Sequence, residues 1–186
     1  MTARQTDWPR EWLMTDERMG DRLWTAIDRL PIKHSGIVFR HYATPPEVRA
    51  TLARRVADIC HRRSLTLAIA ADEGLARSLG ADLVHNPAEP PLGLPFSRSV
   101  HSMQEAEDAA RDGAALVFVS PVRPTRSHEG RNPLGKPLAL RIARAAGVPA
   151  IALGGMNAHN AHGFIRDGFY GWAGIDAWLG EESVRT

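Results

Sequence analysis

The chain has very little cysteine, since Cys60 is the only one among its 186 residues. A single cysteine excludes an internal disulfide, and it also excludes a metal site built from cysteine thiolates. Both absences fit a protein of the reducing cytoplasm, and we therefore predict a cytoplasmic location.

Long apolar runs and charge blocks are missing as well. The opening MTARQTDWPREW has no apolar core of the kind a signal peptide needs, and no run approaches the roughly 18 apolar residues of a membrane span. The 23 Lys and Arg residues nearly balance the 21 Asp and Glu residues, and no basic block marks a nucleic-acid face. We expect no contact with membranes or nucleic acids, and only a modest attraction for small anions.

The length of 186 residues, with 44% hydrophobic and 24% charged residues, is typical of one globular domain spanning residues 1–186. Within it, short apolar runs alternate with segments of helical spacing. The runs favour strands at residues 11–16, 36–40, 65–70, 81–85, 95–101, 114–120, 148–155 and 169–174. The helical segments cover residues 21–30, 45–63, 72–80, 103–113, 137–146 and 157–166, with a last turn at 175–179.

Two helix starts have clear capping signals. Ser102 followed by Glu105 has the spacing of a capping box, and Asn157 stands directly before a helical segment. We expect Ser102 and Asn157 to be the N-caps of these helices.

Regular strand–helix alternation implies parallel strands joined by right-handed crossovers. Eight such units predict a closed (β/α)8 TIM barrel, and an open doubly wound sheet with fewer strands is the alternative. The chain is shorter than the roughly 200 residues at the low end for this barrel. The proline-rich segment NPAEPPLGLPFSR, residues 86–98, has no room for a full helix. We therefore expect the helix after the fourth strand to be shortened or missing.

In such a barrel, functional side chains gather where strands end and loops begin. The seventh and eighth loops contain Gly154-Gly155 and Gly174-Ile175-Asp176, and glycine lets a phosphate approach backbone N–H groups closely. The Asp176 side chain would repel an anion, although its backbone N–H stays available. The sixth loop, PVRPTRSHEG at residues 121–130, adds cations, hydroxyls and a histidine. These three loops predict a phosphate site, with a plain solvated connection as the alternative for residues 121–130.

The histidines and tryptophans allow two interpretations each. His159 and His162 lie three apart on a polar helix start, where a solvated pair is favoured over a metal site. His101 lies at the predicted barrel mouth, as a general base or as a hydrogen-bonded structural histidine. The tryptophans gather near the chain ends, and we expect them to pack across the seam between first and last strands or to form an oligomer contact: Trp8, Trp12, Trp24, Trp172 and Trp178.

Several stretches resemble a known family. GADLVH, RSVHSMQEAEDAARDGAALVFVSPVRPT, PLG and VPAIALGGMNAHN are similar, in matching order and spacing, to the thiamine phosphate synthase/TenI family. The resemblance is specific from about Gly80 to Asp176 and looser over WLMTD and GIVFR. It implies a (β/α)8 barrel, in agreement with the strand–helix pattern.

The resemblance also implies site residues. Arg40 matches the arginine after the second strand, Asp72 matches one Mg²⁺ carboxylate, and Ser99 matches a serine of the active site. In the loop after the sixth strand, Thr125 and Ser127 keep the hydroxyls of a diphosphate clamp, while His128 replaces its lysine. The glycine-rich turns fall where the family holds a monophosphate: Gly154, Gly155, Gly174, Ile175 and Asp176.

The departures from the family pattern leave three functions open. Val38 and Tyr42 replace a glutamine and a lysine, a second metal carboxylate is missing near Pro90, and Pro121 stands where the tautomerase branch has its catalytic histidine. The first function is synthesis of thiamine phosphate from hydroxymethylpyrimidine diphosphate and thiazole phosphate, with release of pyrophosphate and Mg²⁺ as the implied cofactor. The second is thiazole tautomerisation with His101 or His128 as acid and base, and the third is binding of a thiazole or thiamine phosphate without catalysis.

Overall fold

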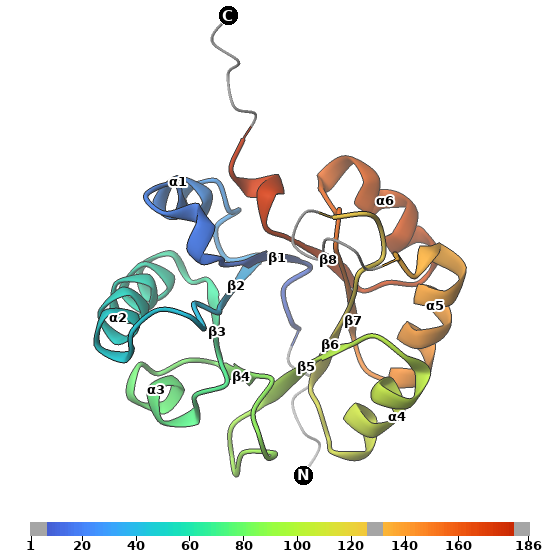
Figure 1. Cartoon of the computed structure of the whole chain (residues 1–186), viewed down its shortest axis with the longest axis horizontal. Coiled ribbons are helices and arrows are strands. Elements are labelled where there is room, and N and C mark those ends of the chain that lie inside the picture. The colour runs from blue at the N-terminus through green and yellow to red at the C-terminus, as the bar shows by residue number, and fades with distance from the viewer. Residues whose placement is uncertain (1–6, 126–131, 181–186) are drawn as a thin grey trace, which may run out of the picture.

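Eight parallel strands close into a barrel in the computed structural model, which describes residues 7–125 and 132–180 (Figure 1). β8 pairs with β1 and completes the ring, so the predicted (β/α)8 barrel is confirmed and the open sheet is excluded. The strands are β1 (Glu11–Met14), β2 (Ser35–Phe39), β3 (Thr66–Ala70), β4 (Leu83–His85), β5 (Phe96–Val100), β6 (Leu116–Val119), β7 (Ala150–Leu153) and β8 (Gly171–Gly174).

Helices surround the barrel and connect most of its strands (Figure 1). They include the two short 3-10 helices η1 and η3. None of the helices within the two described ranges is long and apolar enough to cross a bilayer. The helices are η1 (Glu17–Met19), α1 (Arg22–Asp28), α2 (Pro46–Arg63), α3 (Glu73–Ser78), α4 (Met103–Arg111), α5 (Gly135–Ala146), α6 (Ala158–Asp167) and η3 (Asp176–Trp178).

The connection from β4 to β5 has no helix in residues 86–95, all of which are described. The expected loss of the fourth helix is therefore confirmed. Proline lacks the N–H that a helix interior needs and disfavours helical geometry at the preceding residue. Four prolines in ten residues leave this segment too few helical positions: Pro87, Pro90, Pro91 and Pro95.

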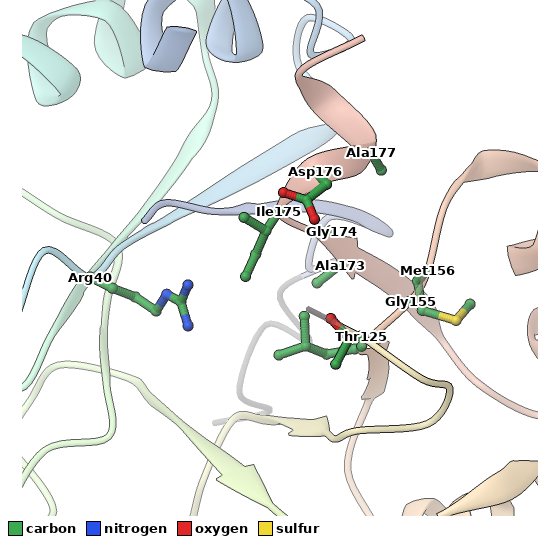
Figure 2. A pocket seen from close by; sticks show the side chains of 11 residues that line it. Arg40, Thr125, Gly155, Met156, Ala173, Gly174, Ile175, Asp176 and Ala177 are labelled. Atoms are coloured by element: carbon green, nitrogen blue, oxygen red, sulfur yellow. The ribbon is translucent and has the colours of Figure 1, made fainter. Parts of the chain in front are cut away.

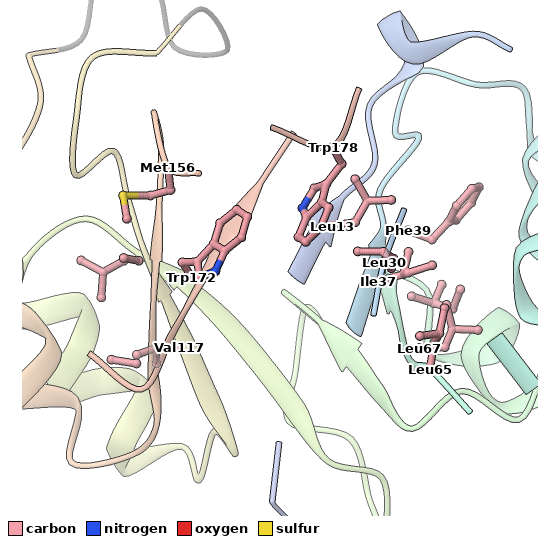
Figure 3. Packing of buried hydrophobic residues seen from close by; sticks show 14 of the residues in the cluster. Leu13, Leu30, Ile37, Phe39, Leu65, Leu67, Val117, Met156, Trp172 and Trp178 are labelled. Atoms are coloured by element: carbon pink, nitrogen blue, oxygen red, sulfur yellow. The ribbon is translucent and has the colours of Figure 1, made fainter. Parts of the chain in front are cut away.

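Strand side chains alternate between two apolar layers, because successive residues of a strand point to opposite faces. One set points inward and fills the barrel, and includes Trp12, Met14 and Phe118. The other set points outward beneath the helices, and includes Leu13 and Ile37 (Figure 3). The barrel is therefore a packed core, and space for a ligand is left only at its ends.

Some predicted boundaries are wrong by a few residues. The strand predicted over residues 11–16 ends at Met14, because Asp16 caps η1 and its Oδ1 accepts the Arg18 N–H at 3.0 Å. The helix predicted from Pro137 begins earlier, at Gly135.

The two predicted caps are confirmed, but the box around Ser102 is not closed. Ser102 Oγ accepts the Glu105 N–H at 3.1 Å, while Glu105 Oε2 accepts the N–H of His101 at 2.6 Å rather than that of Ser102. The reciprocal box forms instead at α6, where Asn157 and Asn160 each accept the other's N–H, at 2.9 and 3.0 Å.

Aromatic side chains cover the seam between β8 and β1, as predicted for Trp172 and Trp178. Trp172 and Trp178 stack with ring centroids 5.0 Å apart, and both belong to the outer apolar layer (Figure 3). The indole N–H of Trp178 donates to the Trp12 carbonyl at 3.0 Å, and the Tyr170 hydroxyl donates to the Trp8 carbonyl at 2.6 Å. The fifth, Trp24, lies on α1 and stacks instead on Arg55 of α2, 3.7 Å from the ring centroid to Cζ.

Candidate functional site

A pocket opens at the carboxyl ends of β7 and β8, and we call it the mouth pocket. It brings together residues that lie as far apart in sequence as Arg40 and Ala177 (Figure 2). Six of the predicted phosphate-binding residues line it. The full lining is Arg40, Thr125, Leu153, Gly154, Gly155, Met156, Ala173, Gly174, Ile175, Asp176 and Ala177.

Gly154 and Gly155 shape one wall of the mouth pocket through their backbone. Both have positive φ angles, +97° and +62°, which side chains other than glycine rarely adopt. A Cβ on Gly154 would lie 2.9 Å from Pro121 Cα, and one on Gly155 would lie 2.4 Å from the Pro124 carbonyl oxygen. The glycines are therefore required first by the close packing of the loops after β6 and β7.

Backbone hydrogen bonds hold these two loops together. Val122 N–H donates to the Leu153 carbonyl at 2.9 Å, and Arg123 N–H donates to the Gly154 carbonyl at 3.2 Å. Asn160 Nδ2 donates to the Gly155 carbonyl at 2.9 Å and ties the turn to α6. Because the carbonyls of Gly154 and Gly155 both accept hydrogen bonds, this turn is held in place beside the pocket.

Arg40 reaches toward the mouth pocket from the side of β2, across from Gly155 and Thr125 (Figure 2). Its Nε donates to the Thr15 carbonyl at 2.8 Å, and its terminal nitrogen lies 3.2 Å from Asp16 Oδ2. Only 18% of the Arg40 side chain and 17% of the Asp16 side chain are exposed. The guanidinium is thus held in one orientation by the end of β1.

Burial and charge shift the pKa values of this pair. Burial lowers the pKa of Arg40, and the charge of Asp16 offsets part of that effect. Burial acts to raise the pKa of Asp16, but hydrogen bonds from Arg18 and the charges of Arg18 and Arg40 outweigh it, so this pKa lies below its usual value. An arginine stays protonated at any physiological pH, so Arg40 supplies a fixed cation to the pocket.

The eighth loop forms the opposite wall. A Cβ on Gly174 would lie 2.9 Å from the Ala177 Cβ and 3.1 Å from the Trp172 ring, so η3 packs tightly onto the end of β8. Ile175 and Asp176 line the same pocket. The Asp176 carboxylate thus lines the same pocket as Arg40 and the glycine turns.

The loop after β6 contributes Thr125 to the mouth pocket. The other two residues predicted there, Ser127 and His128, lie outside the described residues. Their roles stay predictions.

Asp72 lies elsewhere on the barrel mouth and has two structural partners. Its Oδ1 accepts the Leu75 N–H at 2.8 Å and caps α3, while its Oδ2 lies 3.2 Å from Arg49. Arg49 also donates to the Ala70 carbonyl at 2.6 Å. Across residues 7–125 and 132–180, no group of three His, Cys, Asp or Glu side chains is placed to hold a metal ion. Both carboxylate oxygens of Asp72 thus have protein partners, and the described residues do not surround it with a preformed set of metal ligands.

His101 lies just past the end of β5 and is bonded to the end of β6. Its Nδ1 is 2.7 Å from the Ser120 carbonyl oxygen. A carbonyl oxygen only accepts, so Nδ1 carries the proton and Nε2 is the basic nitrogen. Both interpretations made from the sequence, a structural histidine and a general base, are compatible with this geometry.

Ser99 belongs to a polar network inside the barrel that the sequence indicated only in part. Ser99 Oγ lies 3.2 Å from His85 Nε2, and the Ser99 N–H donates to Asn86 Oδ1 at 2.7 Å. The positions of Asn86 and Ser97 were missed, although the alternation in FSRSV already places Ser97 and Ser99 on one strand face. Arg49 was also missed as a partner of Asp72.

A (β/α)8 barrel with a glycine-walled pocket at the ends of its last two strands defines a class of proteins that place small ligands at this end. Comparison with known proteins shows similarity to one family. Residues 93–178 match the family described as thiamine monophosphate synthase (TMP-TENI). A relative from Aquifex aeolicus, provisionally named thiamine-phosphate synthase 2, is 26% identical over 182 residues, which is 92% of this chain and 98% of the relative.

Two further matches agree. The thiamine-phosphate synthase of Geobacillus thermodenitrificans is 30% identical over 146 residues, 70% of this chain and 64% of the relative. The solved structure of thiamine phosphate pyrophosphorylase from Pyrococcus furiosus superposes with a TM-score of 0.80 at 21% identity, covering 98% of this chain and 93% of that one, and shows the shared fold. The chain is thus similar to the thiamine phosphate synthase/TenI family in sequence and in fold.

Proposed function

We propose that this protein joins a pyrimidine methyl diphosphate to a thiazole phosphate and forms thiamine phosphate. The observation that supports this reaction best is the placement of Arg40 across the mouth pocket from the glycine turns at Gly154 and Gly174. One side of the pocket offers backbone N–H groups, and the other offers the fixed cation of Arg40. In the proposal, each side holds the phosphate group of one substrate.

In the proposed reaction, the bond between the pyrimidine methylene carbon and the diphosphate oxygen breaks, and its electron pair leaves with pyrophosphate. The thiazole nitrogen then donates its lone pair to that carbon and forms the new C–N bond. Negative charge grows on the leaving oxygen, so a preorganised cation or hydrogen-bond donor near it lowers the barrier.

The residues of the chain divide this work. Backbone N–H groups at Gly154, Gly155, Gly174 and Ile175 hold the thiazole monophosphate in our proposal, because glycine permits close approach. Arg40 and Ser99 face the diphosphate, with Thr125 as a further hydroxyl. Asp176 stays at the edge of the phosphate and contributes through its backbone.

Mg²⁺ remains a prediction for this protein. Magnesium is usually bound by one or two carboxylates together with substrate phosphates. Both oxygens of Asp72 have protein partners in Leu75 and Arg49. The described residues do not fit a metal site, and we assign no step to a metal.

The proposal is tested by mixing purified protein with both substrates and MgCl2 and measuring pyrophosphate. We expect release by the wild-type chain, and a loss of about 10- to 100-fold in kcat/KM for Arg40→Gln, because a charge-assisted contact contributes about 1.5–3 kcal/mol. Arg54→Gln is the matched control, since Arg54 is exposed on α2. Absence of pyrophosphate at high enzyme concentration would contradict the synthase function.

Thiazole tautomerisation is the second candidate, and the His101 geometry favours it. Because Nδ1 of His101 donates to the Ser120 carbonyl, Nε2 is the ring nitrogen left to exchange a proton with a ligand. If the same preparations release no pyrophosphate but aromatise the thiazole carboxylate phosphate tautomer, and His101→Ala abolishes this, the tautomerase is supported. If neither reaction occurs but thiamine phosphate raises the melting temperature, the protein is a binder.

A further inference from the structure

A chain of polar side chains crosses the barrel interior beneath its mouth. Ser97 Oγ lies 2.9 Å from His85 Nδ1, and Ser99 Oγ lies 3.2 Å from His85 Nε2. His85 is 1% exposed and Ser97 is wholly buried, whereas Ser99 is partly exposed at the upper end. The imidazole thus connects a buried hydroxyl to the hydroxyl of a partly exposed residue.

Asn86 fixes the direction of one hydrogen bond to Ser99. The Ser99 backbone N–H can only donate, and it lies 2.7 Å from Asn86 Oδ1. This contact sets the orientation of the Asn86 amide, so its Nδ2 donates to Ser99 Oγ at 3.3 Å. One acceptor position of the Ser99 hydroxyl is therefore filled by Asn86.

His85 carries a single ring proton under ordinary conditions. Burial lowers the pKa of its imidazole to about 3, and the charges of Arg40 and Arg98 act in the same direction. A neutral imidazole donates from one nitrogen and accepts at the other. The network around His85 therefore has two alternative arrangements, one for each tautomer.

The buried hydroxyl of Ser97 distinguishes the two arrangements. With the proton on Nδ1, Ser97 would accept from His85, and its own proton would have no other acceptor among the described residues. Leaving a buried donor unpaired is costly. With the proton on Nε2, Ser97 donates to Nδ1, Nε2 donates to Ser99, and every buried group is paired.

We propose that His85 is held as the Nε2–H tautomer and that Ser97, His85 and Asn86 are positioning residues which make Ser99 a dedicated hydrogen-bond donor. Two N–H groups then occupy the acceptor positions of Ser99 Oγ. Its own proton points to the mouth, toward an anionic oxygen of the ligand. The identity of that ligand as a diphosphate rests on the proposed function.

The tautomer is tested directly, with no ligand and no activity needed. The full chain is labelled with ¹⁵N-histidine, and two-bond ¹⁵N–¹H correlations identify which His85 nitrogen carries the proton, with His85→Gln used to assign the signal. We expect Nε2–H between pH 6 and pH 8, with no change of state, because the imidazole stays neutral well above its pKa of about 3. A proton on Nδ1 would overturn the proposal.

The consequence for Ser99 is tested by calorimetric titration with inorganic pyrophosphate. Ser99→Ala should weaken binding about tenfold, the effect of losing one hydrogen bond to a charged group. Ser97→Ala should weaken it as well and should populate the Nδ1–H tautomer, while Ser97→Thr, which keeps the hydroxyl, should restore both readouts. The matched control is Ser35→Ala, because the Ser35 hydroxyl is buried and has no hydrogen-bond partner among the described residues.

The outcomes separate this inference from the proposed function. If the Ser97→Ala variant binds pyrophosphate with wild-type affinity and shows a wild-type His85 signal, the positioning role of Ser97 and His85 is overturned. If the wild-type chain binds no pyrophosphate while His85 shows Nε2–H, the diphosphate assignment fails and the tautomer assignment stands.

Discussion

At the scale of single residues, burial decides what the polar groups of this barrel can do. His85 lies wholly inside the protein, and burial lowers its pKa from the usual 6.5 to about 3. Arg40 is partly buried, but Asp16 and the Thr15 carbonyl accept hydrogen bonds from its guanidinium, and it remains a cation. His85 is therefore a neutral ring with one donor and one acceptor nitrogen, whereas Arg40 is a cation held in one orientation.

The buried His85 predicts a specific dependence of stability on pH. Between pH 6.5 and pH 3 the unfolded chain binds a proton at this residue and the folded chain does not. Stability should therefore fall as pH falls through this window, by at most about 1.4 kcal/mol per pH unit from this group. Urea unfolding at several pH values should show a shallower slope for His85→Gln.

His159→Gln is the control for this measurement, because His159 is exposed at the start of α6. It should leave the slope unchanged. An unchanged slope in His85→Gln would mean that His85 is protonated in the folded chain.

At the scale of elements, the strand-end loops depend on one another. The loop after β6 and the turn after β7 share two backbone hydrogen bonds, and Gly154 and Gly155 have no space for a side chain. α6 begins directly after this turn and is closed by its own Asn157–Asn160 box. This wall of the mouth pocket is therefore built by packing between loops.

Gly154→Ala should accordingly destabilise the fold. The positive φ costs about 1–2 kcal/mol, and the clash with Pro121 adds about 1–3 kcal/mol. Gly147→Ala is the matched control, because Gly147 also has a positive φ of +61° but no atom within 4 Å of an added Cβ. Chemical denaturation should show a larger loss for Gly154→Ala than for Gly147→Ala, and equal losses would contradict the tight loop packing.

At the scale of the whole molecule, closure of the barrel joins the two ends of the chain. Trp178 donates to the carbonyl of Trp12, a residue 166 positions earlier, and stacks on Trp172 of β8. These contacts cover the seam where β8 pairs with β1. The last 3-10 helix is thus a structural part of the barrel as well as a wall of the mouth pocket.

Trp178→Ala should destabilise the protein by about 3–5 kcal/mol, the usual range for truncating a buried tryptophan. Trp178→Phe should lose less, because an aromatic ring remains to stack on Trp172, while the indole hydrogen bond and part of the packing surface are removed. Trp24→Phe provides the comparison, since Trp24 packs on α2 away from the seam. Thermal unfolding checks the order, and a Trp24→Phe loss larger than that of Trp178→Phe would contradict the role of the seam.

Local pattern was sufficient for much of this protein. Strand–helix alternation determined the barrel, the prolines of residues 86–95 determined the missing helix, and strand ends determined that Arg40, Gly154 and Gly174 face one region. The spacing of apolar residues and the geometry of proline both determine structure over a few residues. The order of strands and helices that results then determines the barrel topology.

The pairing of side chains was decided only by the tertiary structure. Asp72 was predicted from family resemblance to bind a metal, and the fold places it against Arg49 and Leu75. Ser97, His85 and Ser99 come from neighbouring strands, and their hydrogen bonds depend on the register between β4 and β5. Shifts of a fraction of an ångström between neighbouring strands decide whether such hydrogen bonds form, and the sequence alone does not specify positions so finely.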